Sequence, residues 1–382
     1  MKMSRAVLLE RLPGSIGQVL LLALVAWLAW SGLSNFLANV RTLHVATGLA
    51  FLRTEAGFEI AQSLIEFGPG STYLDAVLVA ALNTLLVIAL AGLIGTAIAL
   101  LIAFGRLAPQ PLIGGACAAY VEVFRNIPLL LQIFFWYFSA IALLPPVAES
   151  LHLGGLILNN RGLFLPRLAL TTAGAWALAA ALVAFVLLAM ATRRALRTRG
   201  VTALGLALLA LLAACLAPLA LLPGQFGIDS PRAEGLNVGG GLALLPELVA
   251  LTLGLAIYNS TFLAEIFRAG ILSVPRGQSE AAATVGLSGV RAALLVTLPQ
   301  ALRVALPPAA GQYQTLAKAS SLAAAIGYPD IMQIVGGTVL SQTSQALEAM
   351  SLVVVLYAAI NLAIALAVNL ANRRLLRHEG RL

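Results

Sequence analysis

The stretch that decides the fold runs from Glu280 to Pro299 and reads EAAATVGLSGVRAALLVTLP. It lies between two apolar runs that are each long enough to cross a bilayer, and it is far more polar than either. Glu280–Ala283 is strong helix-forming material, and Gly286 can adopt the left-handed conformation that ends a helix. Val290–Val296 predicts a second short helix, which Pro299 closes before the next apolar run. The stretch therefore predicts a helical hairpin outside the lipid, held at both ends by membrane helices; an ordinary connecting loop is the alternative.

The composition indicates a membrane protein. Of the 382 residues, 60% are hydrophobic and only 10% are charged, whereas a soluble domain carries roughly 25% charged residues. This leaves too little polar surface for a water-soluble globule, so we expect a polytopic membrane protein. The net charge of +8 does not indicate nucleic acid, because the basic residues cluster at the ends of apolar runs, where they orient a chain in a membrane.

The apolar runs predict an all-α polytopic protein with about eight transmembrane helices. The first run follows Lys2 and Arg5 and could be a signal peptide, but no small-residue cleavage site follows it, so a retained helix is expected. The third run is too long for one straight crossing and is expected to break at Pro128. The predicted spans are about Val19–Leu33, Tyr73–Phe104, Leu112–Leu144, 167–191, 201–222, Leu244–Ala269, Ala301–Ile326 and Ala349–Asn369.

The spans and the charges together predict the organisation of the chain. Residues 1–72 form an N-terminal transmembrane helix and a periplasmic loop, 73–372 the main transmembrane domain, and 373–382 a cytoplasmic tail. The main domain includes a helix pair at about 167–222. Eight crossings put both termini and the hairpin on the side that carries most arginines, and the positive-inside rule makes that side cytoplasmic.

Two charged pairs in apolar surroundings are candidates for a gate. Glu122 and Arg125, followed by Asn126, are three residues apart and therefore share a helix face, and Glu265 and Arg268 repeat the spacing. Charges at membrane depth are usually paired or face a cavity. They could shape a cytoplasmic gate between two subunits, or they could be self-neutralising pairs near the interface.

A second set of polar residues could line a path through the membrane. Lys318 lies deep enough in its predicted span that a lone ammonium would be costly. It could contact the carboxylate of a zwitterionic substrate, or it could extend to the outer interface or contact another helix. Ser320 and Gln312 lie on the same predicted helix, and Asn259 lies on the preceding one.

The sequence contains no recognisable pattern for metal binding, catalysis or nucleotide binding. The two cysteines and three histidines show no metal-ligand spacing, so no metal site is predicted. No nucleophile and base occur in a recognisable arrangement, and no catalytic residue is predicted. A phosphate-binding Gly-x-x-x-x-Gly-Lys-Ser/Thr motif is missing from the sequence, so a nucleotide that drives transport would bind another polypeptide.

The hairpin resembles the EAA loop in the permease subunits of bacterial ABC importers. That loop reads Glu-Ala-Ala, three residues, Gly, nine residues, Ile or Val, one residue and Leu-Pro. In that family the loop docks into a groove on a cytoplasmic ATPase, so the resemblance implies an ATPase-coupling role here. The matching positions are Glu280, Ala281, Ala282, Gly286, Val296, Leu298 and Pro299.

The resemblance extends to polar amino-acid permeases of the histidine and glutamine type. It is carried by the segments 122–132, 260–271, 273–278 and 318–323. It implies a type I importer (MetI-like) core, here with an extra N-terminal helix and the inserted helix pair. Those additions, with 159–162 and 335–338, resemble the long Q-type subunit of general L-amino-acid transporters.

The family implies a multi-subunit importer in the bacterial inner membrane. This chain would be one permease of a heterodimer that works with two ATPases and a periplasmic amino-acid-binding protein. It would hold no cofactor, and ATP with magnesium would bind the partner ATPase. Two alternatives remain at this point: a secondary amino-acid transporter driven by an ion gradient, with Glu122 or Glu265 as the ion site, and a structural membrane anchor for an ATPase.

Overall fold

The computed structural model divides the chain into two compact units, which are described separately. Unit 1 comprises Met1–Asn83 and Pro329–Ala359, and unit 2 comprises Thr84–Tyr328 and Ile360–Leu382. The residues that the structure describes are 5–42, 48–171, scattered positions between 173 and 183, 226–235 and 237–376.

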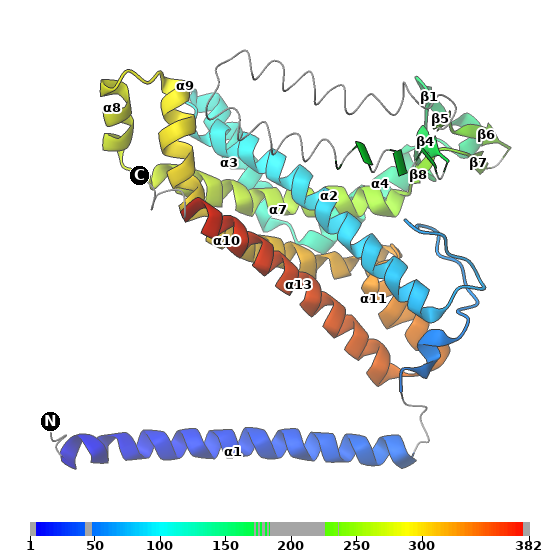
Figure 1. Ribbon diagram of the computed structural model, residues 1–382, viewed down its shortest axis with the longest axis horizontal. Coiled ribbons are helices and arrows are strands. Elements are labelled where there is room, and N and C mark those ends of the chain that lie inside the picture. Colours follow the sequence, from blue (N-terminus) through cyan, green and yellow to red (C-terminus); the bar gives the residue numbers. More distant parts are fainter. Residues whose placement is uncertain are drawn as a thin grey trace. The chain divides into compact units, whose positions relative to one another are not determined.

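Helices dominate the described residues (Figure 1). Four of them are long and apolar enough to cross a membrane, or five if the bent pair α3–α4 counts as one span. The helices are α1 (Arg5–Thr42), α2 (Tyr73–Leu107), α3 (Pro111–Asn126), α4 (Leu129–Leu143), α7 (Pro246–Leu272), α8 (Arg276–Thr284), α9 (Gly289–Ala292), α10 (Leu298–Ala319), α11 (Ile331–Gln333), α12 (Leu340–Thr343) and α13 (Ala346–Leu376). Three-residue and four-residue 3₁₀ turns lie at Val147–Glu149 and Ala50–Arg53, a longer one follows α10 at Ser320–Ile326, and π-helical turns lie at Ala293–Thr297 and Ile334–Val339.

The helices agree with six of the predicted spans in position, while the count of eight is not established. Predicted spans four and five fall almost entirely outside the described residues. Residues 167–170, predicted as the start of span four, form a strand instead. In α1 the strongly apolar part covers Ile16–Gly32, shorter than the other spans.

The third apolar run is broken where the sequence predicts. Helices α3 and α4 meet at an angle of 99°, with Pro128 directly before α4. Gln132 stabilises this break, because its buried Nε2 donates to the carbonyl oxygens of Phe124 at 2.8 Å and Ile127 at 3.0 Å. Both acceptors belong to the end of α3, where helix carbonyls have no partner within the helix.

The segment between α4 and α7 was predicted as loops and the inserted helix pair, and its described residues contain eight short strands. They form a four-stranded antiparallel sheet in the order β1-β2-β3-β8 and two separate ribbons, β4–β5 and β6–β7. The strands are β1 (Leu151–Leu153), β2 (Leu156–Asn159), β3 (Gly162–Leu165), β4 (Arg167–Leu170), β5 (Phe226–Asp229), β6 (Arg232–Glu234), β7 (Asn237–Gly239) and β8 (Leu242–Leu244).

Pairing of β3 with β8 brings the two ends of the segment 166–241 together. Leu163 lies opposite Leu244, and Gly162 has a φ of 138° with the Leu244 carbonyl so close that a Cβ would not fit. Whatever the length of the chain between β3 and β8, it therefore ends beside β3, directly before α7. The insertion can thus leave the packing of α4 against α7 unchanged.

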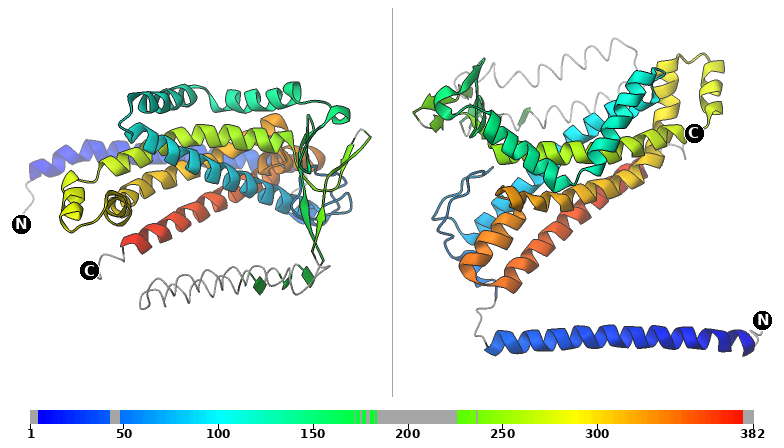
Figure 2. Two further views of the ribbon diagram at one scale, coloured as in Figure 1. Left: turned by 90° about the horizontal axis from the view of Figure 1, so that it is seen from above. Right: turned by 180° about the vertical axis from the view of Figure 1, so that it is seen from behind.

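Helix α7 is the centre of unit 2. It contacts α3, α4 and α10 along its length (Figures 1 and 2). Small residues permit close approach: a Cβ on Gly95 of α2 would lie 3.0 Å from the Ala256 carbonyl oxygen, and one on Gly254 would meet Ile133 of α4 at 2.9 Å. Small residues at helix contacts are the usual solution in membranes, where close van der Waals packing drives helix association.

Candidate functional site

The predicted hairpin is present, and a glycine ends its first helix. Gly286 has a φ of 79°, in the left-handed region. Its N–H donates to the Ala283 carbonyl at 3.0 Å, and the Leu287 N–H donates to the Ala282 carbonyl at 3.1 Å. This pair of hydrogen bonds is the Schellman arrangement that satisfies the last carbonyls of a helix. The predicted left-handed helix end at Gly286 is confirmed, and α8 ends as the sequence indicates.

The two arms of the hairpin pack through small side chains. Ala282 on α8 is 4% exposed and Ala292 at the end of α9 is 7% exposed. Glu280 and Ala281 lie on the exposed face of α8, and Val285 at the tip is 75% exposed. The hairpin therefore presents one face outward. In unit 2 it lies at the end of α7 opposite the strands (Figure 2).

The prediction that Pro299 closes the second short helix is wrong. The backbone is helical without interruption from α9 through the π-helical turn into α10, because Thr297 and Leu298 are both right-handed helical. The Leu298 N–H donates to the carbonyl of Ala293, five residues back. Proline has no N–H to donate, so a widened turn before Pro299 redirects the hydrogen bonds while the helix continues. Val296, Leu298 and Pro299 are half-buried in this continuous helix.

Close packing joins the helices on either side of the hairpin. A Cβ on Gly270 of α7 would lie 2.8 Å from the Ala301 carbonyl oxygen and 3.0 Å from the Ala305 Cβ of α10. Ala301, Ala305 and Ala309 are spaced four apart and buried, so they form one stripe on α10. The α7 and α10 ends therefore form a close-packed base for the hairpin.

The gate candidates are arranged differently from the prediction. Glu265 and Arg268 pair within α7 as predicted, with the Arg268 Nε and Nη2 both 3.1 Å from the Glu265 Oε2. The second Glu265 oxygen accepts from Nη1 of Arg106 at the end of α2. Arg106 was not predicted as a site residue, since its only sequence signal is a charge directly after an apolar run.

The pair predicted for Glu122 and Arg125 does not form. The Arg125 guanidinium lies over the ring of Phe262 on α7, 5.0 Å from its centroid, and Glu122 is exposed. Asn126 donates to the Glu122 carbonyl at 2.7 Å, within its own helix. A cation–π contact with a neighbouring helix has replaced the intrahelical ion pair, which sequence spacing alone does not predict.

Of the residues predicted to line a path, two lie together. Gln312 on α10 donates to the Oδ1 of the buried Asn259 on α7 at 2.9 Å. Lys318 is exposed, and Ser320 is buried with its hydroxyl donating to the Ala317 carbonyl of its own helix end at 2.8 Å. The structure thus brings Asn259 and Gln312 together and joins neither of them to Lys318 or Ser320.

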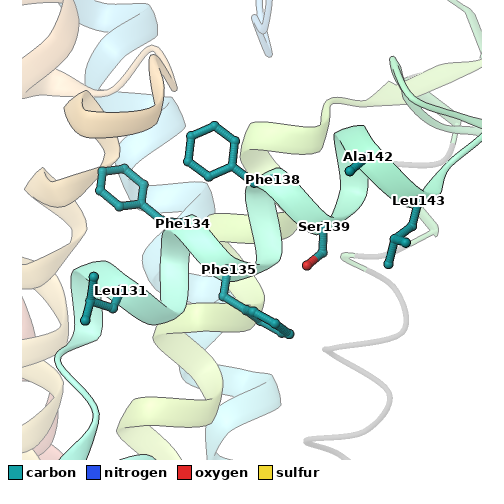
Figure 3. Close-up of a pocket in the computed structure, with 7 residues that line it drawn as sticks. All are labelled: Leu131, Phe134, Phe135, Phe138, Ser139, Ala142 and Leu143. Atoms are coloured by element: carbon teal, nitrogen blue, oxygen red, sulfur yellow. The ribbon is translucent and has the colours of Figure 1, made fainter.

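An apolar hollow of about 400 Å³ runs along α4 (Figure 3). Phe134 and Phe138 point to one side of the helix in this view, and Phe135 to the other. Ser139 supplies the hydroxyl of an otherwise hydrocarbon lining, which suits lipid or an apolar helix better than an amino acid. Its lining residues are Leu131, Phe134, Phe135, Phe138, Ser139, Ala142 and Leu143. In the described part of the chain, no three His, Cys, Asp or Glu side chains lie together as a metal site.

Comparison with known proteins identifies the family. Residues 203–377 match the family model described as binding-protein-dependent transport system inner membrane component. YhdX of Escherichia coli, named as an amino-acid ABC transporter permease protein, is 41% identical over 365 residues, 94% of this chain and 91% of the relative. The general L-amino acid transport system permease protein AapQ of Rhizobium johnstonii is 40% identical with the same coverage.

The name of a third relative specifies four amino acids. The glutamate/glutamine/aspartate/asparagine transport system permease protein BztB of Rhodobacter capsulatus is 34% identical over 93% of this chain and 91% of its own length. These proteins are permeases of ABC transporters, which confirms the predicted class, and the alternative of an ion-driven secondary transporter is set aside. The chain belongs to the family of permease subunits of bacterial amino-acid ABC importers, which have the MetI-like transmembrane fold.

Proposed function

We propose that the α8–α9 hairpin couples this permease to a cytoplasmic ATPase and that the helices attached to it form part of the path for an amino acid. The observation that carries the proposal is the construction of the hairpin. It has a fixed Schellman end at Gly286, an outward face with Glu280 and the exposed Val285, and no break between α9 and α10.

This construction can transmit a displacement. A partner that moves the hairpin also moves α10, because the second arm of the hairpin, α9, is continuous with α10. The contact of Gly270 with Ala301 and Ala305 then passes the movement to α7. Packed helices respond as rigid elements, so a shift at the hairpin would change how α7 and α10 face the path.

The remaining assignments are proposals on the same basis. The sequence holds no P-loop motif, so ATP with magnesium would bind a separate ATPase subunit. We further propose a heterodimer with a second permease, two ATPase subunits and a periplasmic binding protein that delivers L-amino acids. The chain would lie in the inner membrane with both termini cytoplasmic, with 1–72, 73–372 and 373–382 as its three regions.

A crosslinking experiment tests the coupling role. In a background of Cys117→Ser and Cys215→Ser, Val285→Cys should crosslink to a co-purified nucleotide-hydrolysing subunit, because Val285 is the exposed tip of the hairpin. Ala282 would be a poor site because its side chain is buried. The control is Glu59→Cys in the exposed loop that is predicted to be periplasmic, which should capture no ATPase.

Uptake into vesicles tests the energy source. Proteoliposomes with the purified complex, binding protein and a labelled mixture of L-amino acids should accumulate label only when ATP is supplied. Uptake driven by an imposed proton or sodium gradient without ATP would refute the proposal. So would a Val285→Cys variant that transports normally but never crosslinks to an ATPase.

A further inference from the structure

Arg106 lies at a point where three helices come together. A Cβ on the preceding residue, Gly105, would overlap the Sγ of Cys117 on α3, so the ends of α2 and α3 are in direct contact there. The Arg106 side chain reaches in another direction, to Glu265 on α7. Its place at the end of α2 thus lets one side chain join the α2–α3 corner to α7.

The charges in this cluster do not cancel. Glu265 accepts from both Arg106 and Arg268, so two guanidiniums share one carboxylate. The exposed fractions of the Arg106, Glu265 and Arg268 side chains are 23%, 26% and 31%. Partial burial weakens screening by water and salt, so the interaction is stronger than that of a fully exposed pair.

Among the described residues, α3 contacts α7 without an ion pair. Tyr120 on α3 shares a 2.8 Å hydrogen bond with Ser260, and Arg125 lies over the ring of Phe262. Such contacts tolerate sliding better than a carboxylate held by two guanidiniums, whose geometry is directional. Gly95 and Ala99 of α2 also pack against α7, but these contacts involve only apolar residues and backbone. The pair formed by Arg106 and Glu265 therefore adds a directional contact between α2 and α7.

The cluster also lies close to the coupling hairpin along the chain. Glu265 precedes Gly270 by five residues, and at Gly270 α7 packs against Ala301 and Ala305 of α10. A movement of α10 that shifts α7 would therefore act directly on the bond between Glu265 and Arg106. Ion pairs at interfaces between rigid helices are contacts that can break and re-form between two arrangements.

We propose that Arg106 and Glu265 form a positioning contact, the α2–α7 link, that holds the ends of these two helices in one state of the transport cycle and ties ATP hydrolysis to uptake. The proposal rests on the proposed function and adds residues to it. Without the link the complex would still assemble and hydrolyse ATP, but less of the hydrolysis would move substrate.

The experiment measures amino acids taken up per ATP hydrolysed by the complete complex in proteoliposomes with binding protein and labelled L-amino acids. Arg106→Gln and Glu265→Gln should each lower this ratio by at least about fivefold. The exchange of charges, Arg106→Glu with Glu265→Arg, should restore part of it. The matched control is Arg167→Gln, which breaks the 3.0 Å ion pair with Asp229 between β4 and β5 and should leave the ratio unchanged.

The outcomes separate the link from the proposed function. If the wild-type complex shows no ATP-dependent uptake, the proposed function fails. If the wild type is active and Arg106→Gln keeps the wild-type ratio, only the link is refuted. The link is also refuted if Arg106→Gln and Glu265→Gln no longer co-purify with the ATPase, or if the exchanged pair recovers nothing, because either result indicates a merely structural role.

Discussion

Asp330 carries a buried carboxylate outside the predicted membrane spans. It is 1% exposed, its Oδ1 accepts from the Gln333 N–H at 2.8 Å, and its Oδ2 accepts from the Tyr357 hydroxyl at 2.8 Å. It therefore caps α11 and joins that short helix to α13 within unit 1. Burial raises the pKa of Asp330 to about 6, although these hydrogen bonds act in the opposite direction.

The raised pKa of Asp330 predicts how stability depends on pH. Between the unfolded value near 3.8 and the folded value of about 6, the folded state binds more protons than the unfolded state. The free energy of unfolding should therefore decrease as the pH rises through this window, by about 3 kcal/mol at most. Asp330→Asn keeps a capping oxygen and removes the titration.

Thermal unfolding in mild detergent between pH 4.5 and 7.5 measures the effect. The difference in Tm between Asp330→Asn and the wild type should grow in favour of the variant as the pH rises, because other titrating groups are shared and cancel. Glu55→Gln, at an exposed position, is the control and should show no such trend. A constant difference between Asp330→Asn and the wild type would contradict the assignment.

Residues differ in how far sequence alone could place them. The role of Gly286 was predictable because a left-handed helix end depends on local backbone conformation. The partner of Arg125 was not, since Phe262 lies far away in sequence and the spacing to Glu122 favoured a local pair. Asp330 was missed for the same reason, because its burial depends on Tyr357 from a distant helix.

At the scale of elements, the backbone conformation of Gly286 determines where α9 lies relative to α8. The turn after α8 returns the chain so that α9 contacts α8, with Ala282 and Ala292 both buried. Nothing lies within 4 Å of the position where a Cβ on Gly286 would be, so a side chain there meets no steric obstacle. The constraint on Gly286 is the positive φ alone.

Because only the backbone conformation constrains residue 286, substitutions of Gly286 should differ according to how readily they adopt a positive φ. Gly286→Val should reduce uptake per ATP, because a β-branched residue in the left-handed region is strained by about 1–2 kcal/mol, which corresponds to roughly a tenfold loss of the native turn. Gly286→Asn is the matched control, since asparagine adopts this region readily. Equal transport ratios in the two variants would show that the turn conformation is irrelevant to coupling.

The elements that the sequence could not predict are the ones that depend on distant partners. The break at Pro128, by contrast, could be predicted, because it follows from proline chemistry and from the length of the apolar run. The strands contain only three or four residues each, and β3 finds its partner β8 far along the chain. The continuation of the helix through Pro299 was also missed, because it requires a π-helical turn that no spacing rule foretells.

At the scale of the whole chain, we interpret the segment between α4 and α7 as an addition to a permease core. The core helices of unit 2 pack on α7, and the insertion leaves and returns through paired strands. Leu170 at the end of β4 lies opposite Phe226 at the start of β5, so the two ends of the segment 171–225 meet. The sequence predicts two membrane crossings there, and removing an even number of crossings preserves the side of everything that follows.

Replacing residues 171–225 by Asn-Gly should therefore keep the hairpin cytoplasmic. A two-residue turn of this type joins antiparallel strands, so β4 and β5 remain paired and α7 keeps its starting point. With Val285→Cys as the reporter and no other cysteine (Cys117→Ser, and Cys215→Ser wherever that residue remains), a membrane-impermeant thiol reagent should label the protein in inverted vesicles and not in intact spheroplasts. The comparison is a deletion of 171–199, which removes one predicted crossing and should reverse the labelling.

Labelling of the Asn-Gly variant from outside would refute the paired crossings. If the shorter deletion does not reverse the labelling, the arginine clusters rather than the number of spans determine which side the hairpin lies on.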